Sequence, residues 1–307
     1  MTIPVLILHL NTVALAAEFD VGAGFEFVGL ATSGSNDVGV AQAELDARLG
    51  VGPLRLRVDV DLLGPGPFGT ETRTGTGALK PFPEWGAAIM GAPKGWMIAT
   101  GFQPHPVNNE QVDGWSNLFV PYTMGFTELW PGYFLGIRAQ GGAMDGDLIT
   151  SVWGGARSDM AFSEDGLVFG GSAALAGRRR EEVRARAALA VFPVERLLLA
   201  SASVAIPVGD SVKILGDGTL GAGDGLRGSL AGTLVLFPDW QVSPAMRIEG
   251  AEGLGSPWAL DAGVAWSADD ALRVKLSGRV ESGEAWLYAG VSLIDDVEPG
   301  KGWRFAH

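Results

Sequence analysis

The chain contains no cysteine among its 307 residues, which excludes disulfides, thiol nucleophiles and cysteine-bound zinc. Histidine is scarce as well: His9, His105 and His307 leave little material for a histidine-based metal site. Charged residues make up only 19%, and the formal net charge of −13 argues against a nucleic-acid partner. We therefore expect no cofactor, no metal and no catalytic site, and predict that the protein is not an enzyme.

A long apolar segment is also missing. Hydrophobic residues make up 47% and the mean hydropathy is +0.21, yet no window reaches the ~18 consecutive apolar residues that a transmembrane helix needs. Glycine, in contrast, is abundant with 46 copies, and it favours turns and strand bends over helices. An apolar average without an apolar helix is typical of a transmembrane β-barrel, in which the hydrophobic residues alternate with polar ones.

The N-terminus has features of an export signal. Residues 3–10 form a short apolar run, and Ala14-Leu15-Ala16 fits the small-x-small rule for a cleavage site. We predict a signal peptide over residues 1–17 and a single barrel domain over 18–307. The alternative is that the apolar run is a first β-strand of the mature fold.

From residue 18 onward, hydrophobic and polar residues alternate with period two, which indicates strands with two unlike faces. The clearest example covers residues 54–62, and similar runs cover 183–191, 226–236, 260–266 and 272–280. A helix would scatter each apolar set around its circumference. We predict an all-β fold, a transmembrane antiparallel up-and-down barrel of about 12–16 strands.

Short turns and long connections differ in composition. Three tight polar turns each follow an aromatic residue at the end of a strand: Phe192, Phe237 and Trp266. We predict that these turns lie at the periplasmic rim, with each aromatic at the lipid–water boundary. An ordinary hairpin in a soluble sheet would use the same turn residues. The longest connections cover residues 64–83 and 103–130.

Alternation alone does not say which face is buried, because a soluble β-sandwich packs its apolar face inward. Three observations favour a barrel in a membrane. The polar faces are rich in Gly, Ser and Ala, which suits a confined lumen, and the hairpins follow one another without helices, so the sheet can close without an exposed edge. Tryptophans at expected strand ends would form an interfacial girdle. These are Trp85, Trp96, Trp130, Trp258 and Trp266.

The chain from residue 18 resembles a Gram-negative outer-membrane porin-type β-barrel, and its middle resembles the OmpL-like β-barrel porins. The matching residues are Gly-Phe-Gln at 101–103, Pro-Val-Asn-Asn-Glu at 106–110, Gly-Tyr at 132–133 and Gly-Ile-Arg at 136–138. The resemblance implies a location in the bacterial outer membrane, in contact with lipid and lipopolysaccharide. It also implies passive diffusion of small hydrophilic solutes or ions, and a homo-oligomer.

Such a pore selects solutes by its width and by the charges along its lumen. Alternation places ten charged residues on the polar face, and their cationic excess predicts a mild anion preference. Each arginine has a simpler alternative, which is to pair with a neighbouring acid. The predicted pore-lining residues are Arg55, Arg57, Asp59, Asp61, Arg184, Arg186, Arg227, Arg273, Lys275 and Arg279.

Other functions remain open at this point. A non-conducting barrel could act as an anchor or bind a partner through its loops, and a secreted soluble β-sandwich could bury the same apolar faces. An outer-membrane hydrolase would need a histidine beside a serine or an acid. Apart from the terminal His307, only His105 in its Pro-flanked loop is available in the exported part.

Overall fold

The structure is a computed structural model of the whole chain. It describes residues 9–10, 13–14, 17–32, 36–52, 54–63, 80–92, 96–104, 119, 123–129, 133–143, 148–158, 166–175, 184–237, 241–268 and 272–295.

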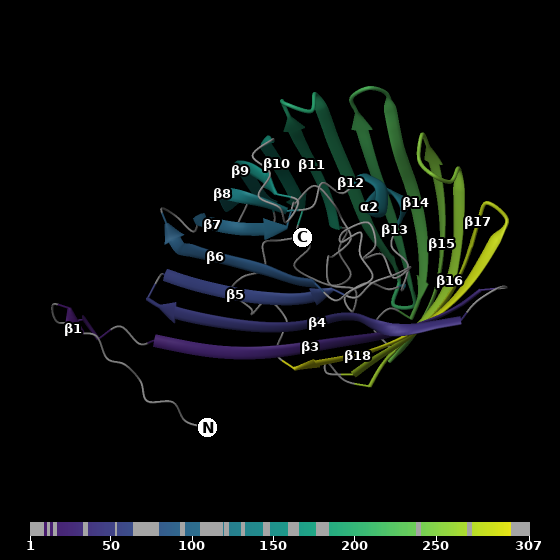
Figure 1. Ribbon diagram of the computed structural model, residues 1–307, viewed down its shortest axis with the longest axis horizontal. Coiled ribbons are helices and arrows are strands. Elements are labelled where there is room, and N and C mark those ends of the chain that lie inside the picture. The colour runs from purple at the N-terminus through teal and green to yellow at the C-terminus, as the bar shows by residue number, and fades with distance from the viewer. Residues whose placement is uncertain are drawn as a thin grey trace.

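Within these residues, sixteen antiparallel strands form one closed barrel in which every strand pairs with its neighbours in sequence (Figure 1). The barrel closes where β18 pairs with β3, for example at Ser292 and Glu26. This confirms the predicted fold at the upper end of the predicted strand number. A separate short hairpin, β1 (His9–Leu10) and β2 (Val13–Ala14), precedes the barrel. The barrel strands are β3 (Ala17–Thr32), β4 (Asn36–Val51), β5 (Leu54–Leu63), β6 (Lys80–Ala92), β7 (Trp96–Pro104), β8 (Tyr133–Ala143), β9 (Leu148–Ser158), β10 (Leu167–Leu175), β11 (Arg184–Phe192), β12 (Leu197–Val208), β13 (Val212–Ala222), β14 (Leu226–Leu236), β15 (Val242–Glu252), β16 (Trp258–Ser267), β17 (Leu272–Glu281) and β18 (Glu284–Asp295).

The large aliphatic side chains lie on the outer face of the barrel. In β14, Leu230 points outward and is 71% exposed. Thr233, three residues further along the strand, points inward and is 5% exposed. The same alternation of exposed and buried residues runs through β11, β15 and β17. A continuous outer band of Leu, Val, Ile and Phe suits contact with hydrocarbon, because exposing this much apolar surface to water is unfavourable. We therefore treat the chain as spanning a membrane.

Two tryptophans mark the limits of this band on one strand. Trp258 begins β16 and Trp266 lies one residue before its end, and both are exposed on the outer face. Eight residues span about 26 Å along a strand, or about 20 Å across the membrane for a tilt of ~40°. This is comparable to the apolar band of ~25 Å that outer-membrane barrels present. Trp258 and Trp266 thus lie where a girdle requires them, whereas the side chains of Trp85 and Trp96, and all of Trp130, lie outside the described residues.

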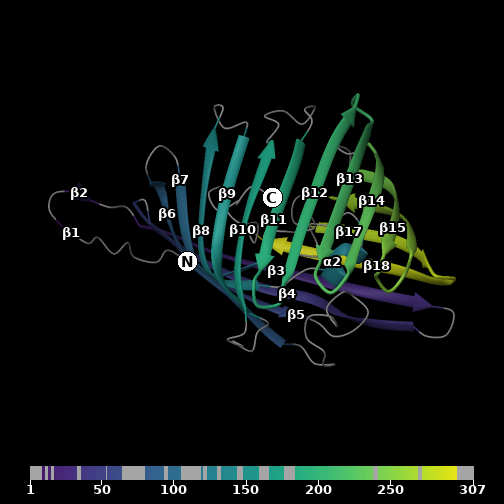
Figure 2. The same cartoon turned by 90° about the horizontal axis from the view of Figure 1, so that it is seen from above.

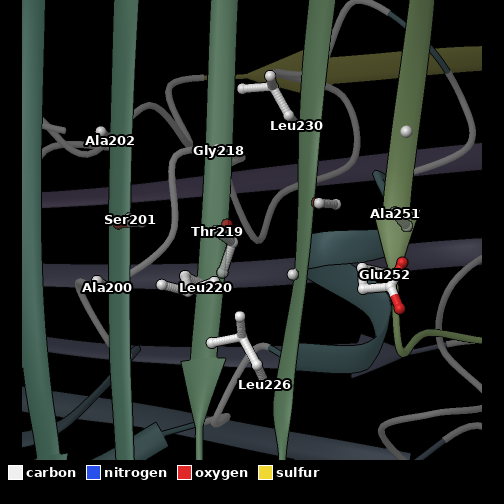
Figure 3. A pocket seen from close by; sticks show the side chains of 13 residues that line it. Ala200, Ser201, Ala202, Gly218, Thr219, Leu220, Leu226, Leu230, Ala251 and Glu252 are labelled. Carbon is white, nitrogen blue, oxygen red and sulfur yellow. The ribbon is translucent and has the colours of Figure 1, made fainter.

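The outer surface is hollowed where its residues are small. A hollow of about 630 Å³ lies over β12, β13, β14 and β15, next to Leu220 and Leu230 (Figure 3). Six of its thirteen lining residues are Ala or Gly, such as Ala202 and Gly218, and the lining also includes Ser201, Thr219, Ser229 and Glu252. Because it opens on the lipid-facing side, it is not a candidate for solute passage.

The barrel has two rims with different connections. The rim that contains turn 209–211 also holds the start of β3 and the end of β18, and we call it the turn rim. The opposite rim, which we call the loop rim, contains turn 193–196 and is also where residues 64–79 and 105–132 connect their strands. Long connections gathered at one rim are typical of outer-membrane barrels.

The predicted placement of the three aromatic turns is wrong in part. The turn after Phe192 joins β11 to β12 at the loop rim, whereas those after Phe237 and Trp266 lie at the turn rim. Phe192 also faces inward and is fully buried, so it does not mark the lipid boundary. It belongs to an inner apolar cluster with Phe134, Trp153 and Leu199, because alternation along β11 makes the even-numbered positions face inward.

The only helix among the described residues, α2 (Met124–Leu129), lies inside the barrel beside β13 and β14 (Figures 1 and 2). No helix in the described part of the chain is long and apolar enough to cross a membrane.

The outer band predicts a depth-dependent cost for a charged residue. We expect Leu230→Arg, near the middle of β14, to lower the free energy of unfolding in lipid by about 2–4 kcal/mol, because the charge would lie in hydrocarbon. Leu226→Arg, at the loop rim of the same strand, should cost at most about 1 kcal/mol. Urea unfolding in phospholipid vesicles measures both. Equal, small costs at the two positions would contradict the membrane assignment.

Candidate functional site

The connection between β7 and β8 enters the barrel, and its described part is held by a carboxylate of the wall. We call this part, Phe119 and residues 123–129, the inner segment. Glu249 on β15 accepts hydrogen bonds from the backbone N–H groups of Met124 at 2.9 Å and Gly125 at 3.2 Å. These are N–H groups of the first turn of α2, which have no partner within a helix. A carboxylate satisfies them and interacts favourably with the helix dipole.

Small residues let α2 lie close to the wall. A Cβ atom at Gly125 would come within 2.4 Å of the Ser229 hydroxyl and 3.2 Å of Thr219 Cβ. On the wall, a Cβ at Gly221 would lie 3.4 Å from Leu129 and 3.2 Å from Leu199. Larger side chains at either glycine would push the helix toward the lumen axis, so these positions help to set the width of the lumen.

Phe119 anchors the inner segment a second time. It is buried, packs with Val235 and Ala245, and lies beneath the guanidinium of Arg247, 4.8 Å from the ring centroid. Such a cation–π contact is attractive when it is removed from water. The inner segment is therefore fixed to β13, β14 and β15 at both of its described ends.

The wall beside the inner segment carries a network of ion pairs. Arg247 Nε lies 2.8 Å from Asp261, and Arg279 lies 2.6 Å from Glu281, 3.6 Å from Asp261 and 3.9 Å from Glu249. Because Arg279 contacts Glu249, the network also orients the carboxylate that holds α2.

A second pair lies further along the wall, where Lys275 and Glu26 are 2.6 Å apart. Glu26 also accepts a hydrogen bond from Ser292 at 3.3 Å, which ties β3 to β18 at the closure of the barrel.

On β8 and β11, the inner wall carries two arginines. Arg138 and Arg186 are both buried and repel each other electrostatically. Arg138 donates a hydrogen bond to Gln140 at 3.2 Å. Between these two strands, the hydroxyls of Ser151 and Ser172 lie 2.7 Å apart. This part of the described wall thus contributes two bases, while the network opposite contains both signs.

The predicted pore-lining residues fall into three groups. The backbones of Arg55, Arg57, Asp59 and Asp61 lie in β5, but their side chains are outside the described residues. Arg184 and Arg227 are exposed at the first and second residues of their strands, and Arg186 faces the lumen. Arg273, Lys275 and Arg279 belong to β17, where the last two form the ion pairs described above. For Lys275 and Arg279 the simpler alternative, pairing with an acid, holds.

Sequence reasoning missed the acids that balance this wall. Glu26 and Asp261 lie on the polar faces of alternating runs, and Glu249 follows the same pattern in β15. Alternation alone could have placed them in the lumen together with Arg138 and Arg247. Their pairing could not be predicted, because it depends on the register between strands.

The described residues contain no group of three or more His, Asp or Glu side chains arranged to hold a metal ion. His105 lies outside the part of the chain that the structure describes.

No protein-family model matches the chain, and no curated protein matches it. Solved structures of bacterial porins do match. OmpF of Salmonella typhi, in complex with daunomycin, has a TM-score of 0.64 at 12% identity, over 90% of this chain and 97% of that one. A triple mutant of the Rhodopseudomonas blastica porin has a TM-score of 0.57 at 10% identity, over 91% and 99%. OmpT, an outer membrane protein of Vibrio cholerae in its trimer form, has a TM-score of 0.59 at 8% identity, over 91% and 99%.

The chain therefore has the fold of bacterial outer-membrane porins, as the sequence predicted. The narrower resemblance to OmpL-like porins has no family match to support it.

The role of Glu249 predicts a measurable loosening of the inner segment. The chain has no cysteine, so Met124→Cys supplies a single thiol at a buried position of α2. We expect Glu249→Ala to speed labelling of this thiol by a polar maleimide about tenfold or more, since two hydrogen bonds to a charged acceptor are lost. Glu252→Ala, on the outer face of the same strand, is the matched control. Equal labelling rates in both variants would show that Glu249 does not hold the segment.

Proposed function

We propose that the protein is a porin of the bacterial outer membrane, which lets small hydrophilic solutes diffuse passively. The observation that carries the proposal is a closed sixteen-stranded barrel with an aliphatic outer face and charged, hydroxylic inner positions. Interiors of this kind are filled by water and conduct solutes. The likeness to OmpF, to OmpT and to the R. blastica porin supports the proposal, as does the inner segment that narrows the lumen on one side.

The proposal has further parts. Residues 1–17 serve as the export signal, whose last residue, Ala17, is also the first residue of barrel strand β3. The outer band contacts membrane lipid, including lipopolysaccharide. A homo-oligomer is supported by the trimer form of the V. cholerae protein. We propose no enzymatic activity, and a hydrolase activity that His105→Ala abolished would contradict this.

The mild anion preference now depends on fewer residues than alternation implied. The described ion pairs combine three bases, Arg247, Lys275 and Arg279, with four acids, so that wall supplies no positive excess. The preference is supported instead by Arg138 and Arg186 on the other side. Fixed lumen charges of one sign raise the local concentration of the opposite ion.

A bilayer experiment tests the pore. Purified protein in a planar bilayer should show discrete conductance steps, whereas a non-conducting anchor would show none. In a salt gradient we expect a reversal potential that indicates a weak preference for anions. In the double variant Arg138→Gln, Arg186→Gln, the reversal potential should shift in the direction that indicates a greater share of cation current. The control is Lys275→Met with Glu26→Gln, which removes a neutral pair and should leave the potential unchanged. Strong cation selectivity of the unchanged protein would contradict the anion preference.

A further inference from the structure

One row of inward positions consists almost entirely of uncharged hydrogen-bonding side chains. Following the register from β8 to β14, successive partners are Gln140, Ser151, Ser172, Ala188, Ser201, Thr219 and Ser229. We call these seven residues the hydroxyl row. None of them is ionisable, and Ala188 is the only member without a polar side chain.

The two adjacent rows are mixed in character. On the loop-rim side, the row is apolar in its middle, at Trp153, Gly170, Ala190, Leu199 and Gly221, and has an arginine at each end, Arg138 on β8 and Arg227 on β14. On the turn-rim side, the row has charged or polar residues only from β11 to β13, at Arg186, Ser203 and Asp217; its other members, Gly142, Ile149, Ala174 and Ala231, are apolar. From β11 to β13, the hydroxyl row thus lies between an apolar stretch and a charged or polar stretch of the inner wall.

The row also runs along the barrel from one rim toward the other. Ser151 is the fourth residue of β9, which begins at the turn rim, whereas Ser229 is the fourth residue of β14, which begins at the loop rim. Six strand spacings make the row about 29 Å long, and a strand tilt of ~40° gives it a rise of about 19 Å along the axis. The row is therefore a slanted track through the lumen.

Four members of the track remain partly exposed: Gln140, Ser172, Thr219 and Ser229. Ser151 and Ser201 are buried. In the neighbouring row, Ser203 and Asp217 are cross-strand partners and also half-buried. At the loop-rim end, Gly125 of the inner segment lies over Thr219 and Ser229, so the track leads to the narrowed part of the lumen.

We propose that the hydroxyl row recognises neutral polyhydroxylated solutes, that is sugars and polyols, as they pass through the pore. A hydroxyl both donates and accepts hydrogen bonds and can rotate to suit its partner, so a series of them matches a solute that is covered with hydroxyls. The row itself carries no full charge, and only its β8 end is bonded to a charged group, since Arg138 donates a hydrogen bond to Gln140. The rest of the row can bind a neutral solute without the cost of displacing tightly held water. This inference rests on the proposed pore function and names its solute class.

The test compares two neutral solutes of nearly equal mass, arabinose and triethylene glycol, by swelling of proteoliposomes. Two double variants remove polar groups from the row: Gln140→Leu with Ser172→Ala near its β8 end, and Ser172→Ala with Thr219→Val across its middle. We expect the ratio of arabinose to triethylene glycol permeation to fall about threefold or more in each, since each lost hydrogen bond weakens binding by a factor of about two to ten.

Three controls make the result specific. Thr233→Val removes an inward hydroxyl outside the row and should leave the ratio unchanged. Ser172→Ala with Thr219→Ser keeps one hydroxyl and should restore part of the ratio. The conductance for potassium chloride should change little in all variants.

Two outcomes would overturn the proposal while leaving the pore intact: an unchanged ratio, or an equal fall for both solutes, which would mean that the row only sets the width. If the unchanged protein lets neither solute through and shows no conductance, the proposed pore function itself fails and the inference falls with it.

Discussion

The structure depends on one constraint: every backbone N–H and C=O group of the spanning strands must find a partner within the sheet, because hydrocarbon offers none. Closure between β3 and β18 meets this constraint, since it leaves no edge strand in the barrel. Once the sheet is closed, alternate side chains must face either lipid or the interior. The exposed Leu230 and Ile248 and the buried Thr233 and Arg247 are direct consequences of this division.

The interior is asymmetric, because different kinds of residue occupy the inward positions on its two sides. One side, from β13 to β3, is occupied by the inner segment and by ion pairs that neutralise one another. Glu249 joins the two, because it holds the first turn of α2 and also lies next to Arg279. The other side carries the buried Arg138, which donates a hydrogen bond to Gln140, and Ser172, whose hydroxyl lies 2.7 Å from that of Ser151. The proposed anion preference follows from this side of the barrel, whereas the hydroxyl row begins here and continues to Thr219 and Ser229, beside the inner segment.

Much of the fold could be predicted from period-two patterns, because they depend only on neighbours in sequence. The assignment of Leu54, Leu56 and Val58 to an exposed outer face is confirmed. Phe192 is a residue for which a turn motif gave the wrong prediction. Its position before a turn suggested the membrane boundary, whereas the alternation along β11 places its side chain inside the barrel. The balance of charge required the register of distant strands, since Ser292 and Glu26 are 266 residues apart in sequence and adjacent in the barrel. The contact of α2 with Glu249 had no local signal at all, because it depends on the path of a long connection.

The most direct test of the account concerns neighbouring positions on one strand. Ala202 faces outward and Ser203 inward on β12, and the absence of cysteine allows a single spin label at each. Electron paramagnetic resonance of the protein in lipid nanodiscs would measure collisions of each label with oxygen, which concentrates in hydrocarbon, and with a water-soluble nickel complex. The account predicts that the label at 202 responds to oxygen and the label at 203 to nickel. Access of nickel to the label at 202 would mean that the aliphatic face is not in lipid. A label at 203 that neither reagent reaches would mean that the interior holds no water, and the two results together would contradict the account.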